Sequence, residues 1–215
     1  MPYNKYGEKS RRRFDPSEDP YYSRIPRSEL VFYNPDKNIS QLRMKVMSRP
    51  NPIPDDTTLV VYIDGACRNN VRPTARASYG VYFGPDSLYN TCGLLDESLP
   101  QTSTRAEIEA FRQALWRIIA VTVTCREVFR IKIATDSSFL VKAMSQWIER
   151  WIEKNGVGSN GRQVAHFQVL KKLHGDMVSL ENNDKTGRRE YQFWHVRREM
   201  NREADALANK ALDEA

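Results

Sequence analysis

The chain has few cysteines and no long apolar run, and each absence excludes a class of protein. Its three cysteines, Cys67, Cys92 and Cys125, are widely spaced and form no CxxC pair. This pattern argues against a disulfide framework or a structural zinc site and favours a reducing compartment. No apolar stretch approaches the roughly 20 residues that span a bilayer. The first residues also lack the apolar core of a secretory signal. We therefore expect an intracellular protein, nuclear or cytoplasmic, that does not bind membranes.

Positive charge is in modest excess and is spread along the chain. The 33 Lys and Arg residues outnumber the 27 Asp and Glu residues, so the net charge is +6. Residues 1–56 carry 11 basic and 8 acidic residues, and residues 57–215 carry 22 and 19. The excess weakly indicates an anionic partner, without a dedicated basic tail.

Residues 1–56 differ in composition from the rest of the chain. They hold eight of the eleven prolines and show no sustained helical or strand period. Residues 49–56, RPNPIPDD, are typical of a stiff, extended linker. Aromatic residues are nevertheless frequent, which is unusual for pure disorder. We predict an N-terminal extension and linker that contacts a protein partner or nucleic acid, with residues 28–33 suited to docking on the domain or on a partner.

Residues 57–215 have the pattern of one α/β domain. The run 59–63, LVVYI, is typical of a strand buried on both faces, and it is predicted to end at Asp64-Gly65. Residues 77–84 and 89–95 predict two further strands of an antiparallel meander. The remaining pattern predicts a helix at 104–120, a strand at 128–135, helices at 139–154 and 163–180, a strand at 190–197 and a helix at 203–212. This order predicts a mixed sheet with helices on its faces.

Four carboxylates stand at related positions on these elements. Asp64 and Asp136 each follow a predicted strand, and ligands of open α/β sheets bind beyond the carboxyl ends of strands. Glu107 lies one turn into the first predicted helix and Asp205 one turn into the last. Four carboxylates with few matching cations repel one another at neutral pH, so their convergence is favourable mainly around divalent cations. An all-oxygen donor set favours Mg²⁺ or Mn²⁺ over zinc.

Each carboxylate also has a purely structural interpretation. Asp64 and Gly65 form a common turn pair. Thr104 and Glu107 have the spacing of a capping box, and Asp205 suits the positive end of a helix dipole. For any single residue the structural interpretation is at least as good as the catalytic one. The four together favour a catalytic site.

Four segments carry these residues in an order that resembles a known family. They are IDGACRNN, TSTRAEIEA, ATDSS and NREADALA. They resemble the signature segments of ribonuclease H, type 1 class, over about residues 57–215. The resemblance implies the ribonuclease H-like α/β fold, a five-stranded mixed sheet of order 3-2-1-4-5 with helices on both faces.

The resemblance also implies a reaction. Asp64, Glu107, Asp136 and Asp205 would be both the catalytic residues and the ligands of two Mg²⁺ ions, with Mn²⁺ as an alternative. The substrate would be an RNA–DNA hybrid, and a monomeric enzyme would cut its RNA strand endonucleolytically, leaving 5′-phosphate and 3′-hydroxyl ends. One ion would lower the pKa of the attacking water and the other would stabilise the leaving oxygen.

Substrate contacts are implied for residues beside the carboxylates. Cys67, Asn69 and Asn70 follow the first aspartate, where the family recognises the ribose 2′-hydroxyl groups that distinguish RNA from DNA. Ser103 and Thr104 stand where relatives carry an Asn-Gln pair that touches the minor groove of the hybrid.

Two further contacts and one departure follow from the same resemblance. Thr102 matches a threonine that binds phosphate, and Trp151, with Trp147, matches aromatic residues that flank the DNA strand. Many relatives carry a loop histidine before the last helix, but residues 197–202 are short and contain none. We interpret His195 as a packed strand residue, with Arg198 or Glu199 as candidates to fill the gap. A subgroup with such short loops keeps activity, so we expect an enzyme.

Two other functions remain compatible with the sequence. The first is a nucleic-acid-binding module on the same fold with little turnover, against which the complete set of carboxylates argues. The second is a nuclease domain derived from a retroelement.

Overall fold

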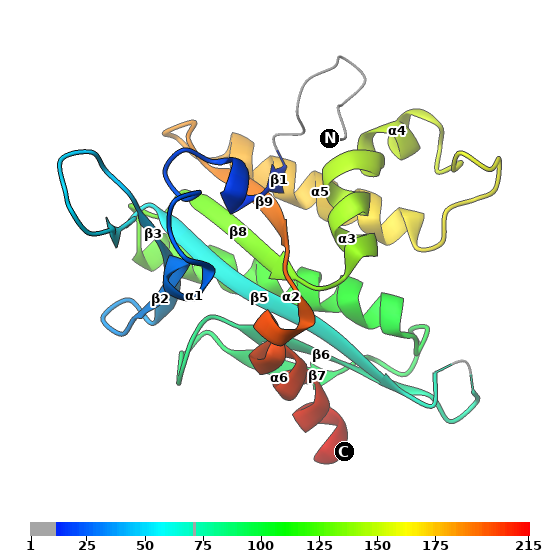
Figure 1. Ribbon diagram of the computed structural model, residues 1–215. Helices are drawn as coiled ribbons and strands as arrows, with labels where there is room; N and C mark the ends of the chain where they lie inside the picture. The colour runs from blue at the N-terminus through cyan, green and yellow to red at the C-terminus, as the bar shows by residue number, and fades with distance from the viewer. Residues whose placement is uncertain (1–11, 71) are drawn as a thin grey trace.

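The computed structural model describes residues 12–70 and 72–215, and within them one nine-stranded sheet runs through the molecule (Figure 1). Its strands are β1 (Arg13–Phe14), β2 (Val31–Asn34), β3 (Ile39–Met44), β4 (Ile53–Pro54), β5 (Thr58–Arg68), β6 (Arg76–Tyr82), β7 (Thr91–Leu94), β8 (Arg130–Thr135) and β9 (Glu190–His195). The helices are α1 (Arg27–Leu30), α2 (Ser103–Thr124), α3 (Ser138–Lys142), α4 (Ile148–Glu153), α5 (Phe167–Asn182) and α6 (Arg202–Asp213). None of these helices is long and apolar enough to cross a membrane.

The five strands predicted from the sequence are present in the predicted order. β7, β6 and β5 form an antiparallel meander, and β8 and β9 follow β5 in parallel. When the five predicted strands are numbered 1 to 5 along the chain, their order across the sheet, β7-β6-β5-β8-β9, is 3-2-1-4-5. The predicted strand order is therefore confirmed. The helix predicted at 163–180 begins only at Phe167, and the one predicted at 139–154 contains a π-helical turn, Ala143–Trp147, between α3 and α4.

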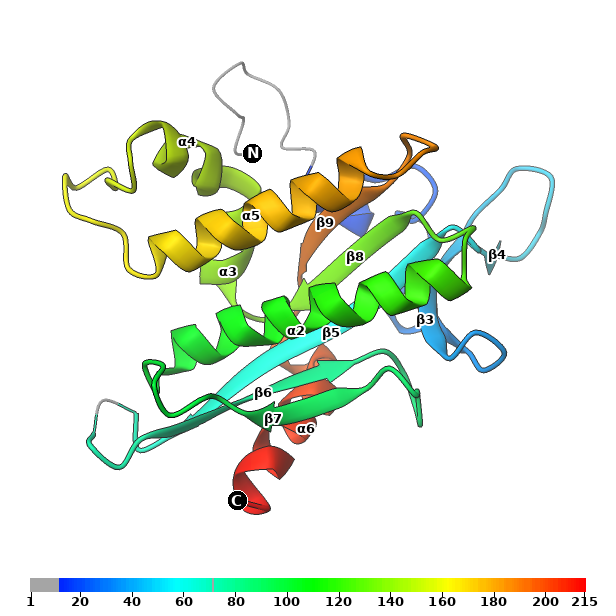
Figure 2. The same cartoon turned by 180° about the vertical axis from the view of Figure 1, so that it is seen from behind.

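The central strand β5 is covered on both faces, as its apolar run indicates. Leu59, Val61 and Ile63 belong to the main core, in which α2 packs on the sheet. Val60 and Tyr62, which alternate with them, pack in a second cluster on the other face. Figures 1 and 2 show α2 and α5 on one face of the sheet and α6 on the opposite face.

The second cluster is built by the segment that the sequence indicates as an extension. Phe14, Tyr22 and Leu30 are buried there against β5, β8 and β9. β1 pairs with the edge of β9, and β3 pairs with β5 at Ser40 and Val60. Within residues 49–56, the stretch predicted to be a stiff, extended linker, Ile53–Pro54 pairs with β3. The prolines separate short segments whose apolar side chains pack against the sheet. Whether residues 57–215 fold alone stays a prediction.

A buried polar network fastens this segment to the sheet. Asp55 is 1% exposed and accepts hydrogen bonds from the Tyr22 hydroxyl and the Thr57 hydroxyl, each at 2.6 Å. Asp55 also forms an ion pair with Arg130 of β8. Burial, together with the hydrogen bond to Asp55, raises the pKa of Tyr22 far above its usual range. The network joins the N-terminal segment, β5 and β8 in one place.

The Asp55 network yields a stability prediction with an adjacent control. Asp55→Asn should lower the free energy of unfolding by roughly 2–4 kcal/mol, because it breaks a buried ion pair and its hydrogen bonds. Asp56→Asn removes only a surface pair with Lys37, the Asp56 side chain being 62% exposed, and should cost less than about 1 kcal/mol. Urea unfolding measures both. Equal losses would show that the segment does not depend on Asp55.

Candidate active site

Asp64 and Asp136 are brought together by the register of two parallel strands. β5 pairs with β8 through Tyr62 and Ala134, so Asp64 and Asp136 stand side by side two residues further along. Asp64 is 9% exposed. The prediction that the strand ends at Asp64-Gly65 is wrong, and so is the turn interpretation. β5 continues to Arg68 because β6 remains paired with it after β8 has ended.

Glu107 reaches the same place from the second turn of α2. The helix is capped by Thr102, whose side chain accepts from the Arg105 amide, so Thr104 and Glu107 do not form the capping box that their spacing indicates. A methyl group added at Gly65 would collide with the backbone of Ala106 and Glu107. Glycine at position 65 therefore lets α2 approach β5 closely enough for Glu107 to line the cavity.

Two side chains outside the carboxylate set hold it in position. The Ser137 hydroxyl donates to Glu107 Oε2 at 2.5 Å. Asn201 is 1% exposed and its Nδ2 donates both to Asp136 Oδ1 at 2.9 Å and to the Ile63 carbonyl at 3.1 Å. Its Oδ1 is buried and has no hydrogen-bond partner among the described residues. Asn201 thus links the carboxyl end of β8 to the β5 residue that precedes Asp64.

Asp205 comes from the first turn of α6, whose close packing on the sheet depends on Gly80. A side chain at Gly80 would collide with Ala204 and Ala208 of α6. Arg198 Nη2 lies 3.4 Å from Asp205 Oδ1, in an ion pair whose arginine side chain is 78% exposed. This surface pair offsets little of the negative charge in the cavity.

The four carboxylates line one open cavity of about 320 Å³. Burial, together with the charges of Asp136 and Asp205, raises the pKa of Asp64 to about 8, although the Gly65 amide donates to it at 2.9 Å. Burial and the charge of Asp136 also raise the pKa of Glu107, against the effect of the Ser137 hydrogen bond. The carboxylates are therefore held closer together than their charges favour. A site of this kind binds cations.

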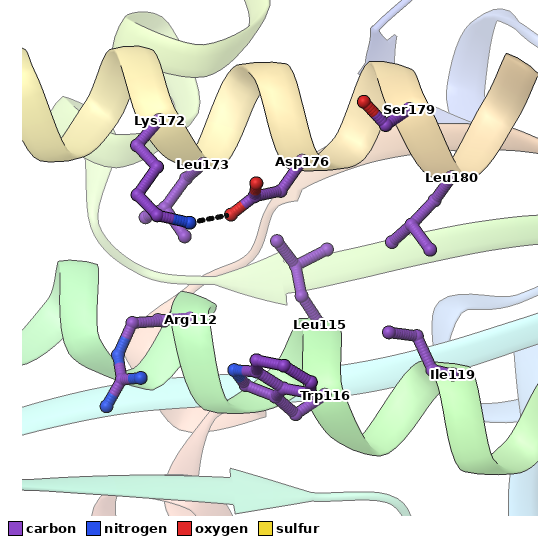
Figure 3. Close-up of a pocket in the computed structure, with 9 residues that line it drawn as sticks. All are labelled: Arg112, Leu115, Trp116, Ile119, Lys172, Leu173, Asp176, Ser179 and Leu180. Carbon is purple, nitrogen blue, oxygen red and sulfur yellow. Dashed lines mark hydrogen bonds and ion pairs between the residues drawn. The ribbon is translucent and has the colours of Figure 1, made fainter.

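A second hollow, between α2 and α5, has a different character (Figure 3). Leu115, Trp116 and Leu180 are among its apolar lining residues. Its carboxylate, Asp176, is already paired with Lys172 at 2.8 Å. This hollow therefore lacks the group of neighbouring carboxylates that lines the first cavity.

The sequence model of the family described as RNase H matches residues 56–213. The chain belongs to the RNase H family. Human ribonuclease H1 is 31% identical over 73% of this chain and 51% of its own length, and the mouse protein is 29% identical over 74% and 51%. Ribonuclease H of Schizosaccharomyces pombe is 27% identical over 99% of this chain and 72% of its own length. The chain thus spans about half the length of its mammalian relatives.

Solved structures show the same fold at low identity. LC11-RNase H1, isolated from compost, has a TM-score of 0.51 at 22% identity and covers 74% of this chain and 97% of its own. The PFV RNase H domain has a TM-score of 0.52 at 19% identity and covers 71% and 92%. The ribonuclease H-like fold expected from the signature segments is therefore confirmed.

The carboxylate cavity of this RNase H chain fits a hard divalent cation by its donor chemistry. All four acidic groups offer oxygen, and burial together with the charges of Asp136 and Asp205 raises the pKa of Asp64. Within the part of the chain that the structure describes, no three His, Cys, Asp or Glu side chains form a closed metal cluster. Such a cage is not needed for Mg²⁺, which commonly keeps several waters and binds through one or two carboxylates and substrate phosphates.

The expected substrate contacts lie at different distances from this cavity. Cys67 and Ser103 line it. Asn69 is exposed at the end of β5 with a φ of 52°, and Asn70 lies next to it, its Oδ1 at 3.8 Å from Cys67 Sγ. Thr102 and Thr104 belong to the start of α2, beside Ser103. Their roles toward substrate stay predictions.

Trp151 and His195 lie in surroundings other than those expected. Trp151 is 9% exposed and packs in the main core, with its ring 5.5 Å from that of Trp147. It is not among the residues lining the carboxylate cavity, and it has little surface left for a DNA strand. His195 is exposed, which contradicts its interpretation as a packed residue, and its Nε2 lies 3.3 Å from the Asp136 carbonyl.

Sequence reasoning missed Ser137, Asn201 and Asn209 at this site. Ser137 directly follows Asp136, and Asn201 opens the segment NREADALA, so both were inside the signature segments. Their positions in these segments do not reveal their roles, because Ser137 orients Glu107 and Asn201 orients Asp136, each on a different element. Arg198, proposed as a substitute for the loop histidine, does line the cavity.

The raised pKa of Asp64 predicts how stability depends on pH in the absence of divalent cations. In the unfolded chain an aspartate has a pKa near 3.9, so between about pH 4 and pH 8 the folded protein binds the extra proton. The free energy of unfolding should therefore fall as pH rises through this range, by a few kcal/mol, since each pKa unit corresponds to about 1.4 kcal/mol.

Asp64→Asn is the matched variant for this pH dependence. It should be more stable than the wild type at pH 8 and should show a flatter profile, measured by urea unfolding in EDTA. Excess Mg²⁺ at pH 8 should stabilise the wild type more than the variant, because a ligand that binds only the folded state adds its binding free energy. Identical pH profiles would contradict the electrostatic description of Asp64.

Proposed function

We propose that the protein hydrolyses the RNA strand of RNA–DNA hybrids with two divalent cations, Mg²⁺ or Mn²⁺. The observation that carries the proposal is the meeting of Asp64, Glu107, Asp136 and Asp205 in one cavity. Membership of the RNase H family and the likeness to proteins named ribonuclease H1 support the choice of substrate.

The four carboxylates would hold the ions, and Asp64 is best suited to be shared between them. It is the buried member, and it interacts with both Asp136 and Asp205. Bound cations would lower the pKa of a water molecule and stabilise charge on the leaving oxygen. The protein's own contribution is to keep the oxygen donors in place on β5, β8, α2 and α6 before substrate arrives, so that little reorganisation accompanies the reaction.

Recognition of the RNA strand would take place at the wall that β5 forms beyond Asp64. Gly65, Ala66 and Cys67 line the cavity there, with Ser103 on the side of α2. Small side chains leave room for a sugar to approach, and the Ser103 hydroxyl can donate to or accept from a 2′-hydroxyl group. Asn69, Asn70, Thr102 and Thr104 would extend these contacts along the strand.

The cleavage assay has a clear expected outcome. With Mg²⁺ or Mn²⁺, purified protein should cut the labelled RNA strand of a hybrid and leave the same RNA intact in single-stranded form. Asp64→Asn and Asp136→Asn should each lower the rate at least 100-fold, with hybrid binding unchanged or tighter because repulsion of phosphates is reduced.

Asp176→Asn, which alters only an exposed helix pair on α5, serves as the control and should cleave at the wild-type rate. Cleavage by the Asp64 or Asp136 variant at that rate would overturn the cation assignment. Binding of the hybrid without cleavage in either ion would favour a nucleic-acid-binding module.

Asn201 provides a test of how the carboxylates are positioned. Asn201→Ala removes the donor to Asp136 and leaves the Ile63 carbonyl without its side-chain partner. We expect kcat to fall about 10- to 100-fold, as is usual for residues that orient metal-binding groups. Asn201→Asp should be at least as impaired, because a carboxylate at this position repels Asp136. Mg²⁺ titration followed by calorimetry should show weaker binding in both variants. Wild-type kcat and Mg²⁺ affinity in Asn201→Ala would contradict the positioning role.

A further inference from the structure

The hairpin that joins β5 to β6 is strongly and uniformly basic. Residues 65–85 include Arg68, Arg72 and Arg76 and no acidic residue. The paired ends of β5 and β6 project from the body of the molecule, away from α5 and β9 (Figures 1 and 2). The acidic cavity and the basic hairpin thus occupy consecutive parts of one strand.

Two arginines of the hairpin, Arg68 and Arg76, repel each other electrostatically. Arg68 and Arg76 are directly opposite each other in the β5–β6 ladder, and like charges in this position destabilise a sheet. Arg68 is compensated, because it pairs with Asp213 and donates to the Leu212 carbonyl of α6. Arg76 has no such compensation. Its side chain is exposed and makes no hydrogen bond or ion pair with the described residues, although Glu97 lines the same surface hollow.

Arg72 is the second arginine without a partner. It lies in the connection between the strands, where its amide donates to the Asn69 carbonyl and its own carbonyl accepts from Ala75, both at 2.9 Å. These bonds use its backbone only. Its exposed side chain makes no hydrogen bond or ion pair within the part of the chain that the structure describes. Two arginines on this hairpin are therefore free to bind anions.

The strand geometry sets how far these charges lie from the cavity. Arg68 is four residues from Asp64 along β5, and Arg76 lies opposite Arg68. Four strand residues span about 13 Å at roughly 3.3 Å per residue. Phosphates of one duplex strand recur about every 3.4 Å along the axis, so this distance corresponds to roughly four base pairs. A duplex that runs along β5 from the carboxylates would meet Arg68 and Arg76 within half a helical turn, with Arg72 further along in the connection.

We propose that the β5–β6 hairpin is an arm that binds the phosphate backbone of the hybrid beyond the cleavage site, through Arg72 and Arg76. The inference rests on the proposed function and deepens it. An acidic cavity repels a polyanion until cations are bound, and a basic arm on the same strand supplies the opposing attraction. Because arginine binds phosphate without reading bases, the arm adds affinity for any sequence.

The test compares a double variant with a control of equal charge. Arg72→Gln/Arg76→Gln removes both charges of the arm. Arg126→Gln/Lys185→Gln removes two exposed charges that precede β8 and β9, at the opposite end of the sheet from Asp136. Hybrid binding is measured by fluorescence anisotropy, with each variant in an Asp64→Asn background, between about 50 and 200 mM salt.

The arm variant should bind a hybrid of about 24 base pairs roughly tenfold more weakly than the parent protein. The slope of log K against log salt concentration should decrease in magnitude by about 2, close to 0.9 for each lost phosphate contact. The control variant should keep the parent affinity and slope.

Cleavage and stability measurements distinguish an arm that binds substrate from a hairpin that only supports the fold. With Asp64 present, the arm variant should have a higher KM and an unchanged kcat, and its thermal midpoint should be equal or higher because the Arg68–Arg76 repulsion is gone. The proposal is overturned if the arm variant and the control have the same affinity and salt slope on the hybrid. Failure of the wild type to cleave would instead refute the proposed function, and the binding comparison would still decide the role of the arm.

Discussion

The mutual repulsion of buried carboxylates is the constraint on which the rest of this structure depends. Asp64 and Asp136 are forced together by the parallel register of β5 and β8, and α2 and α6 add Glu107 and Asp205 to the same cavity. Such an arrangement persists only on a rigid frame, because each acidic group would move apart or take up a proton if it could. Burial, together with the charges of Asp136 and Asp205, raises the pKa of Asp64. The site stores electrostatic strain that bound cations would relieve.

The frame is made rigid by burial of β5 on both faces. The main core with α2 covers one face, and the N-terminal segment covers the other through Phe14, Tyr22 and Leu30. The Asp55 network then fixes that segment to β5 and β8, the two strands that carry Asp64 and Asp136. The proline-rich N-terminal segment therefore holds in place the two strands that carry Asp64 and Asp136. This explains why a segment remote from the cavity in sequence can matter for its geometry.

Charge is divided along β5 in a way that suits a polyanionic substrate. The strand carries an acidic cavity at Asp64 and leads directly into a hairpin whose Arg72 and Arg76 have no partners in the described residues. Within the cavity, Ser137 and Asn201 orient Glu107 and Asp136 without contributing charge. Under the proposed function, catalysis and attraction of the substrate would be carried out by neighbouring parts of one element.

The sequence by itself determined the strand order and the four carboxylates, because local patterns and the signature segments carry that information. It did not determine the course of residues 12–56, whose short strands have no period of their own and gain stability only from the sheet. It also misplaced the end of β5 at Asp64, because continued pairing with β6 lies outside that segment. The resemblance assigned Trp151 to substrate, but Trp151 packs in the main core, because a matched position in the sequence does not tell which side of a helix is covered. The positioning role of Asn201 was decided by tertiary structure alone, because its partners, Ile63 and Asp136, are 138 and 65 residues away along the chain.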